Sequence, residues 1–380
     1  MKKICYIVTI STTIKAFFIE QLQYLSNNGF DVTVVCSQDN ALQAMLGQKI
    51  RYFPIEIPRG ISFFDSIFAI EKMYIFFKSQ KFDIIQYSTP NAAFCASFAA
   101  KLAGVKIRNY HLMGLRYLGS TGISRKMLKV VEKITCALST SIECVSKSNL
   151  QMGILEGVFT ANKATVVWNG STGGVDLKKF DYYRREEWRK EIRSKFGLVD
   201  TDFLFGFVGR ITRDKGINEI FEAFQQISGS AKLLLVGNPE GLETLNPELL
   251  RIAKQDSNVI FHSSVFDIEK YYAAIDVLLL PSYREGFGNV IIEAAAVGTP
   301  AIVSDIPGPI DAIDEGKTAK VIPVKDVTAL TEAMLQCIEK TQFDSKACVD
   351  FVATRFDSKV LCKYILKHKR NMILNHRNNK

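Results

Sequence analysis

Short runs of apolar, often β-branched residues alternate with amphipathic segments of helical length along almost the whole chain. Strands that are buried on both faces have this continuous apolar character, because a parallel sheet carries helices on both of its sides. Regular alternation with helical segments is typical of doubly wound parallel sheets. We therefore predict an α/β protein, with strands at 3–9, 31–36, 52–55, 84–87, 107–111, 141–145 and 165–167, and again at 203–208, 232–236, 259–262, 277–280, 301–304 and 320–322.

A break rich in turn residues divides this pattern into two series. Residues 168–174 contain three glycines, and the strongly charged segment 181–195 that follows is expected to form a solvated helix. A length of 380 residues suits two domains. We predict a Rossmann-like domain at 1–175, a second at 176–355, and a basic helix or tail at 356–380 that crosses back to the first. The other expected helices are 17–27, 66–79, 92–102, 124–137, 217–227, 268–274, 290–298, 310–315 and 327–340.

Cysteine and histidine usage indicates a reduced protein without a metal site. The eight cysteines include no Cys-x-x-Cys pair, and most stand in apolar surroundings, as expected for core residues of a cytoplasmic protein. The four histidines are dispersed and form no cluster with ligand spacing. The apolar run 4–10 is too short for a signal peptide and is expected to be a buried strand. We therefore expect no metal, no other cofactor and a cytoplasmic location.

The net charge of +9 is unevenly distributed. Residues 1–180 carry +10, residues 181–356 carry −7 and residues 357–380 carry +6. We expect the basic regions to face an anionic partner. Nucleic acid is disfavoured, because the basic residues are not interleaved with aromatic stacking positions.

A phospholipid surface fits this charge pattern better. The segments 117–133 and 363–370 mix Lys and Arg with apolar residues, as basic amphipathic helices that lie on anionic bilayers do. The phenylalanine-rich segment 61–79 is instead expected to pack in the core, ahead of the next strand. The sequence thus predicts peripheral attachment to an anionic membrane through the first half and the tail.

A dinucleotide-dependent enzyme is disfavoured by the loops that follow the first strand of each series. Neither loop contains the G-x-G-x-x-G fingerprint that lets a backbone approach a pyrophosphate. The glycines at 170–174 have the wrong spacing and precede no expected helix. A dehydrogenase is therefore not the predicted function.

Two loops of the second series carry residues suited to an anionic ligand. Arg210 and Lys215 follow a strand and precede a helix, which is where doubly wound sheets bind ligands. Farther along, another strand is followed by a glycine-rich turn and a helix whose first amides would form an anion pocket. Glu285 on that turn and Glu293 in the helix can face one ligand at different depths. Glu293 lies among apolar residues, where a carboxylate needs a partner.

This arrangement resembles the E-x7-E signature of the retaining GT-B glycosyltransferases, the glycosyl transferases group 1. Other elements match the same family: Gly209-Arg210 with Lys215-Gly216, Leu235-Val236-Gly237, the strand ending in Pro281-Ser282, and Gly298-Thr299-Pro300. The match is close over residues 165–330, whereas the first half matches only in architecture. The resemblance implies two Rossmann-like domains facing a cleft. It also implies a metal-independent enzyme that uses a nucleotide-diphosphate sugar, UDP-linked by preference.

The resemblance further implies a role for individual residues. Arg210 and Lys215 would hold the donor diphosphate and neutralise its charge as it leaves. Glu285 would contact hydroxyls of the transferred sugar, and Glu293 would accept hydrogen bonds from the ribose. The remaining residues expected to contact the nucleotide-sugar are Gly209, Gly237, Gly286, Phe287, Gly288, Asn289, Val290 and Ile291.

The acceptor side departs from the family pattern. The loop after the first strand, which contains Thr12 and Thr13, has no glycine, and Met113 stands where many members have a histidine. His111 either replaces that catalytic histidine or is a core residue, and both alternatives stay open. Arg116 is a further candidate to meet an anionic acceptor.

The resemblance implies a retaining hexosyltransferase of capsule or O-antigen synthesis. The expected acceptor is a polyprenyl-diphosphate-linked saccharide at the inner face of the cell membrane. Two alternatives stay open: a non-catalytic nucleotide-sugar-binding protein, and a nucleotide-sugar epimerase of the same fold.

Overall fold

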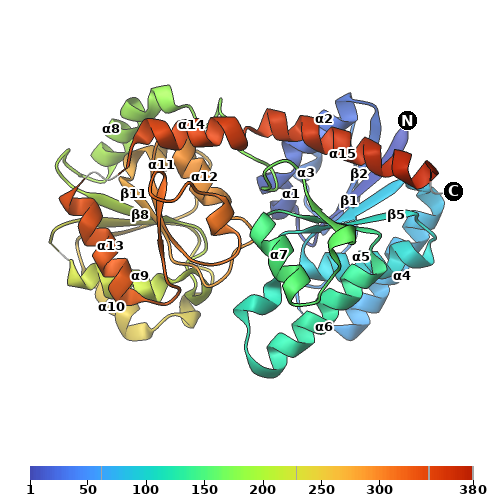
Figure 1. Ribbon diagram of the computed structural model, residues 1–380, viewed down its shortest axis with the longest axis horizontal. Coiled ribbons are helices and arrows are strands. Elements are labelled where there is room, and N and C mark those ends of the chain that lie inside the picture. The colour runs from blue at the N-terminus through green and yellow to red at the C-terminus, as the bar shows by residue number, and fades with distance from the viewer. Residues whose placement is uncertain (61, 228, 341–342, 379–380) are drawn as a thin grey trace. The chain divides into compact units, whose positions relative to one another are not determined.

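The computed structural model describes residues 1–60, 62–227, 229–340 and 343–378. The chain forms two compact units, one made of Met1–Gly173 with Ser358–Lys380 and the other of Gly174–Asp357 (Figure 1). The chain therefore passes between the units twice, after Gly173 and after Asp357. The last helix, α15 (Ser358–Asn378), belongs to the first unit.

The first unit is built on a parallel sheet with the strand order β3-β2-β1-β4-β5-β6-β7. The order reverses beside β1, which pairs with β2 on one side and with β4 on the other, so the sheet is doubly wound. Each strand is within two residues of a predicted one, because continuous apolar runs mark buried parallel strands well. The bounds are β1 Lys2–Ile7, β2 Phe30–Cys36, β3 Arg51–Pro54, β4 Ile84–Tyr87, β5 Ile107–Leu112, β6 Ser141–Cys144 and β7 Ala164–Val166.

Two helical layers cover the faces of this sheet (Figure 1). One layer shares a core with the sheet through residues such as Met73, Phe77 and Cys136, and consists of α4 (Phe63–Gln80), α5 (Pro90–Leu102), α6 (Gly122–Leu138) and α7 (Lys147–Leu155). The opposite layer packs around Phe18 and Ile365, and consists of α1 (Ser11–Phe17), α2 (Ile19–Asn27), α3 (Leu42–Leu46) and α15.

The prediction that the aromatic segment 61–79 packs in the core is wrong for part of its length. Residue 61 lies outside the described residues. Met73 and Phe77 are buried, but Phe64 and Phe68 are 74% and 60% exposed. The reason is geometric, because a helix lying on a sheet buries only one stripe and α4 carries large apolar residues on several sides.

A buried ionic cluster fixes α15 to the sheet of the first unit. Lys369, which is fully buried, donates to Glu143 Oε2, and His111 Nδ1 lies 3.0 Å from Glu143 Oε1. Asn109 donates a further hydrogen bond of 3.1 Å to the same carboxylate. Burial alone would raise the pKa of Glu143, but the Lys369 ammonium and the His111 ring hold it well below its usual value.

The second unit has a parallel sheet with the strand order β10-β9-β8-β11-β12-β13. It reverses beside β8, which pairs with both β9 and β11. The two sheets confirm the predicted fold class of two Rossmann-like α/β domains. The strand bounds are β8 Leu204–Val208, β9 Lys232–Val236, β10 Val259–His262, β11 Val277–Leu280, β12 Ala301–Ser304 and β13 Ala319–Ile322.

Helices also form two layers in the second unit (Figure 1). One contains α8 (Arg185–Lys195), α11 (Ile268–Ala274), α12 (Asn289–Ala296) and α14 (Ser345–Arg355), and the other α9 (Ile217–Gln226), α10 (Pro247–Gln255) and α13 (Val327–Glu339). The expected solvated helix at 181–195 is in fact amphipathic: Trp188 is buried, and Arg193 bonds Asp276 at 2.6 Å. The helix expected at 310–315 is only a short turn, Pro309–Asp311.

We predict that Lys369→Met destabilises the protein by about 3–5 kcal/mol, because the buried Glu143 carboxylate loses its charged partner. Urea denaturation measures the change in the free energy of unfolding. The control Lys367→Met alters an exposed lysine on the same helix and should have little effect. The double variant Lys369→Met with Glu143→Gln should recover much of the loss. A single variant as stable as the wild type would show that the ion pair is not what fastens α15.

Candidate functional site

The candidate site of the second unit lies where its strand order reverses. β8 and β11 are neighbours in the sheet, and the loops that follow them leave its carboxyl edge side by side. The backbone amide of Tyr283 donates to the carbonyl of Asp214 at 2.9 Å, which ties the two loops together. Ligands of doubly wound sheets bind at this position.

Glycines allow the loops to approach backbone to backbone. Gly216 has φ +74°, and a β-carbon there would lie 2.2 Å from the carbonyl oxygen of Pro281. A β-carbon at Gly237, which follows β9, would lie 1.8 Å from the carbonyl oxygen of Gly209. Any other side chain at Gly216 or Gly237 would force the loops apart, so both glycines set the spacing of the site.

Lys215 and Glu285, which the sequence places seventy residues apart, meet in this site. Lys215 Nζ donates to Glu285 Oε1 at 2.6 Å, and Ser282 Oγ donates to the same oxygen at 2.9 Å. Both side chains of the ion pair are largely buried. The cation and the carboxylate thus stand together, next to the turn that leads into α12.

Arg210 lies on the same edge but is open to solvent, with 56% of its side chain exposed. Its guanidinium is 3.8 Å from Asp214, which also forms a 3.0 Å ion pair with Arg284. Burial would raise the pKa of Asp214, but the hydrogen bond from Thr212 and the charge of Arg284 lower it. Asp214 therefore stays ionised and steadies two cations beside the site.

The turn before α12 presents backbone rather than side chains. Gly288 has φ +91° and, having no side chain, leaves the first turn of α12 without a side-chain cap. Phe287 and Ile291 are buried, and the Ile291 amide donates to the carbonyl of Gly288 at 2.9 Å. Ile291 therefore offers no free amide here, and Gly286, Asn289 and Val290 border the positive end of the helix dipole.

Glu293 is half-buried, in the second turn of α12, and has a partner that sequence reasoning missed. The hydroxyl of Tyr272 donates to Glu293 Oε2 at 3.0 Å, and Tyr272 itself is fully buried. Burial raises the pKa of Glu293, while the hydrogen bond from Tyr272 and the charge of Lys179 act in the opposite direction. Tyr272 lies on α11, and no local motif marks it.

In the first unit, the strand order reverses between β1 and β4, and threonines gather there. Thr12 and Thr13 lie in the first turn of α1, directly after β1. The hydroxyls of Thr9 and Thr89 are 2.9 Å apart and link the two loops. Thr89 has φ +57°, which is unusual for a β-branched residue, and sequence reasoning overlooked it. Thr89 could have been found from the sequence, because Ser88-Thr89-Pro90 comes immediately after a predicted strand, where ligands of parallel sheets bind.

His111 is placed in the core rather than on the surface of this edge. It is 3% exposed; its Nδ1 faces Glu143 and its Nε2 lies 3.4 Å from the hydroxyl of Thr172. With both ring nitrogens facing protein groups, His111 fits the core alternative. Arg116 is exposed in the segment after β5, at the same edge as Thr12 and Thr13.

Two further searches cover only the residues that the structure describes. Among them, no group of three or more His, Cys, Asp or Glu side chains is arranged to hold a metal ion. Across the same residues, no helix has both the length and the apolar character needed to span a bilayer.

Comparison with known proteins gives matches over both units. Residues 189–351 match the family model "Glycosyl transferases group 1", and residues 3–146 match "Glycosyl transferase 4-like". The chain is 30% identical to the capsular polysaccharide biosynthesis glycosyltransferase CapM of Staphylococcus aureus, covering 89% of this chain and 88% of CapM.

Two further proteins, one related in sequence and one similar in structure, are also glycosyltransferases or share this fold. The chain is 24% identical to the UDP-Gal:alpha-D-GlcNAc-diphosphoundecaprenol alpha-1,3-galactosyltransferase of Escherichia coli, over 89% of this chain and 88% of that protein. The Anabaena protein HepE, solved with UDP and glucose, superposes with a TM-score of 0.79 at 19% identity, over 97% of this chain and 100% of HepE. The fold is thus GT-B, as predicted, and the chain belongs to the glycosyl transferases group 1 family.

Proposed function

We propose that this glycosyltransferase moves a sugar, with retention of anomeric configuration, from a UDP-sugar to a polyprenyl-diphosphate-linked saccharide. The transfer would take place at the inner face of the cell membrane, in the synthesis of a capsule or O-antigen. The observation that carries the donor side of the proposal is the contact between Lys215 and Glu285 beside the first turn of α12. In this contact the Lys215 ammonium, which would bind the diphosphate, donates a hydrogen bond to the Glu285 carboxylate, which would accept hydrogen bonds from the sugar hydroxyls.

The donor diphosphate would bind between the exposed Arg210, Lys215 and the positive end of α12. Before the donor arrives, Glu285 neutralises Lys215. A bound diphosphate would share the Lys215 ammonium, and Glu285 would then be available to accept from the sugar. As the bond to the sugar breaks, negative charge grows on the leaving phosphate, and fixed cations stabilise that charge more than they stabilise the bound donor.

The similar proteins support the choice of donor and acceptor. The Escherichia coli relative is named for a UDP-linked sugar and a diphosphoundecaprenol acceptor, and CapM for capsular polysaccharide biosynthesis. HepE is solved with UDP and glucose. The basic character of residues 1–180 agrees with an anionic acceptor at an anionic membrane. Thr12, Thr13 and Arg116, at the carboxyl edge of the first sheet, are the residues proposed to meet that acceptor.

We predict that Arg210→Ala and Lys215→Ala each reduce kcat by a factor that corresponds to about 2–4 kcal/mol, because each removes a charge that stabilises the leaving diphosphate. Steady-state transfer from UDP-sugars to a short-chain polyprenyl-diphosphate acceptor measures the effect. Lys317→Ala, which removes an exposed lysine of the same unit outside the site, is the matched control. Turnover near that of the control in both site variants would refute the diphosphate assignment.

We predict that Glu293→Gln weakens UDP binding about tenfold, because the ribose hydroxyls lose a charged acceptor. The pKa of Glu293 is raised, so its charged form, and with it the affinity for UDP, should increase as the pH rises through that pKa. This increase should be missing in Glu293→Gln.

Calorimetry with UDP at several pH values tests both points. Glu285→Gln is the comparison variant, expected to lower turnover while UDP affinity stays close to that of the wild type. If Glu285→Gln loses UDP and Glu293→Gln does not, the two roles are assigned the wrong way round.

We also predict that transfer continues in excess EDTA, because Arg210, Lys215 and the α12 terminus supply the positive charge that a divalent ion supplies in other transferases. Initial rates with and without EDTA measure this. Complete loss of activity that manganese or magnesium restores would contradict it.

A further inference from the structure

The helical layer α4–α5–α6 of the first unit carries large apolar side chains that are well exposed to solvent. Phe64, Phe68 and Ile75 follow one another at spacings of four and seven residues along α4 and are more than half exposed. On α6, Ile123, Met127 and Val130 follow a helical spacing of four and three residues and are also more than half exposed. Two helices on the same face of one sheet thus each carry a second apolar stripe, besides the one that faces the core.

The helix between them continues this surface. α5 packs against both α4 and α6. Its outer residues Phe94 and Phe98 are partly exposed, with ring centroids 5.0 Å apart. Exposed apolar residues are common singly, but an apolar surface that extends over three neighbouring helices indicates an interaction site.

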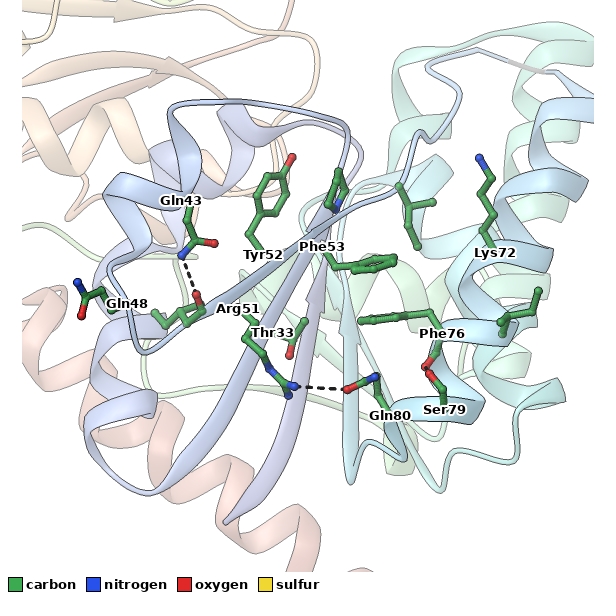
Figure 2. Close-up of a pocket in the computed structure, with 14 residues that line it drawn as sticks. Thr33, Gln43, Gln48, Arg51, Tyr52, Phe53, Lys72, Phe76, Ser79 and Gln80 are labelled. Carbon is green, nitrogen blue, oxygen red and sulfur yellow. Dashed lines mark hydrogen bonds between the residues drawn. The ribbon is translucent and has the colours of Figure 1, made fainter.

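A hollow along α4 enlarges the same apolar surface (Figure 2). It has a volume of about 910 Å³ and lies between α4 and the edge strand β3. Figure 2 shows the rings of Phe53 and Phe76 facing each other inside it, 4.1 Å apart and nearly parallel. Lys72 stands at the rim, and Arg51 and several amide and hydroxyl side chains also line the hollow, but none of the described residues that line it is acidic. The lining therefore combines apolar contact with positive charge.

The charges on this layer are mostly positive and come from α6. Lys126 and Lys133 are exposed, whereas the only acidic residue of α6, Glu132, is buried. Arg125 and Lys129 are both engaged by Glu156, so they are less available than the sequence suggested. On α4, the exposed Asp65 and Glu71 balance Lys72 and Lys78. α4 thus supplies mainly apolar contact, and α6 supplies apolar contact and positive charge.

The basic tail lies on the opposite side of the sheet. α15 packs in the layer of α1, α2 and α3, on the sheet face opposite the α4–α6 layer (Figure 1), and its Lys363 and Lys367 are exposed. A flat bilayer cannot touch both layers at once. The predicted membrane contact through both the segment 117–133 and the tail is therefore not possible on one flat bilayer, and only one of the two layers can bind it.

We propose that the α4–α6 layer is the side of the first unit that lies against an anionic lipid bilayer, with the apolar side chains of α4 and α6 inserted among the lipids and Lys126 and Lys133 at the headgroups. The inference deepens the proposed function, because a lipid-linked acceptor is reached at a bilayer. Apolar contact and lysines on one surface are the combination that interfacial helices use. The tail on α15 then faces the solvent.

The test is co-sedimentation of the full chain with vesicles of phosphatidylcholine alone or mixed with phosphatidylglycerol. We expect the wild type to bind the mixed vesicles. Phe64→Ser with Phe68→Ser should weaken binding about tenfold or more, since two large apolar side chains no longer leave water. Lys126→Glu with Lys133→Glu should weaken it comparably at low salt and less at high salt.

Matched variants on the opposite layer serve as controls. Met45→Ser with Leu374→Ser, and Lys363→Glu with Lys367→Glu, change exposed residues of the same kinds and should bind as the wild type does. In Phe68→Trp, brominated lipids should quench the fluorescence beyond the level of the two native tryptophans, whereas in Leu374→Trp they should not. Insertion is thereby distinguished from adsorption by charge alone.

The proposal is overturned if the wild type ignores anionic vesicles, if the control variants lose as much binding as the α4 and α6 variants, or if tryptophan at Phe68 is not quenched. A wild type that is a dimer in solution, and that Phe64→Ser with Phe68→Ser converts to a monomer, would assign the surface to a second copy instead. UDP calorimetry on the same variants distinguishes a failure of this proposal from a failure of the proposed function. The affinity for UDP should stay unchanged in these variants, whether or not they bind vesicles.

Discussion

The close approach of the loops after β8, β9 and β11 is the constraint on which the candidate donor site depends. Gly216 and Gly237 leave no room for a β-carbon, and the hydrogen bond from Tyr283 to Asp214 holds two of the loops in register. Lys215 and Glu285 come within 2.6 Å of each other only because their loops meet in this way. The doubly wound order of the sheet puts that meeting point at its carboxyl edge, next to the start of α12. Local backbone packing thus creates the electrostatics of the site.

A second constraint acts in the first unit, where Glu143 joins the last helix to the sheet. The carboxylate faces Lys369 from α15, His111 from β5 and Asn109 from the same strand. His111 also approaches Thr172, two residues before the chain passes to the second unit. One buried anion therefore connects the returning helix with the segment that leaves the unit. Both ring nitrogens of His111 thus face protein groups, which fits the core alternative for this residue.

The sequence was sufficient to predict the strands and the donor loops but not the contacts of isolated side chains. Strands such as Ile84–Tyr87 could be found because parallel strands are continuously apolar, and Lys215 and Glu285 because they stand in a spaced motif. Tyr272 could not be found, since its link to Glu293 exists only after α11 packs on α12. Three helices missed by the apolar pattern, α7, α10 and α14, do begin at side-chain caps, Ser146, Asn246 and Asp344, which a search for caps would have found. The exposure of Phe64 and Phe68 was hidden, because composition does not tell how many sides of a helix are covered.

The central claim is that this chain is a retaining transferase that releases UDP from a UDP-sugar when a lipid-linked acceptor is present. The most direct measurement follows UDP release from a panel of UDP-sugars, with and without a short-chain polyprenyl-diphosphate saccharide, and determines the anomeric configuration of the product by proton NMR. The account predicts acceptor-dependent release from at least one UDP-sugar and an α-linked product from an α-linked donor. An inverted product, or a chain that releases UDP from none of them while ADP-, GDP- or dTDP-sugars are used, would contradict it.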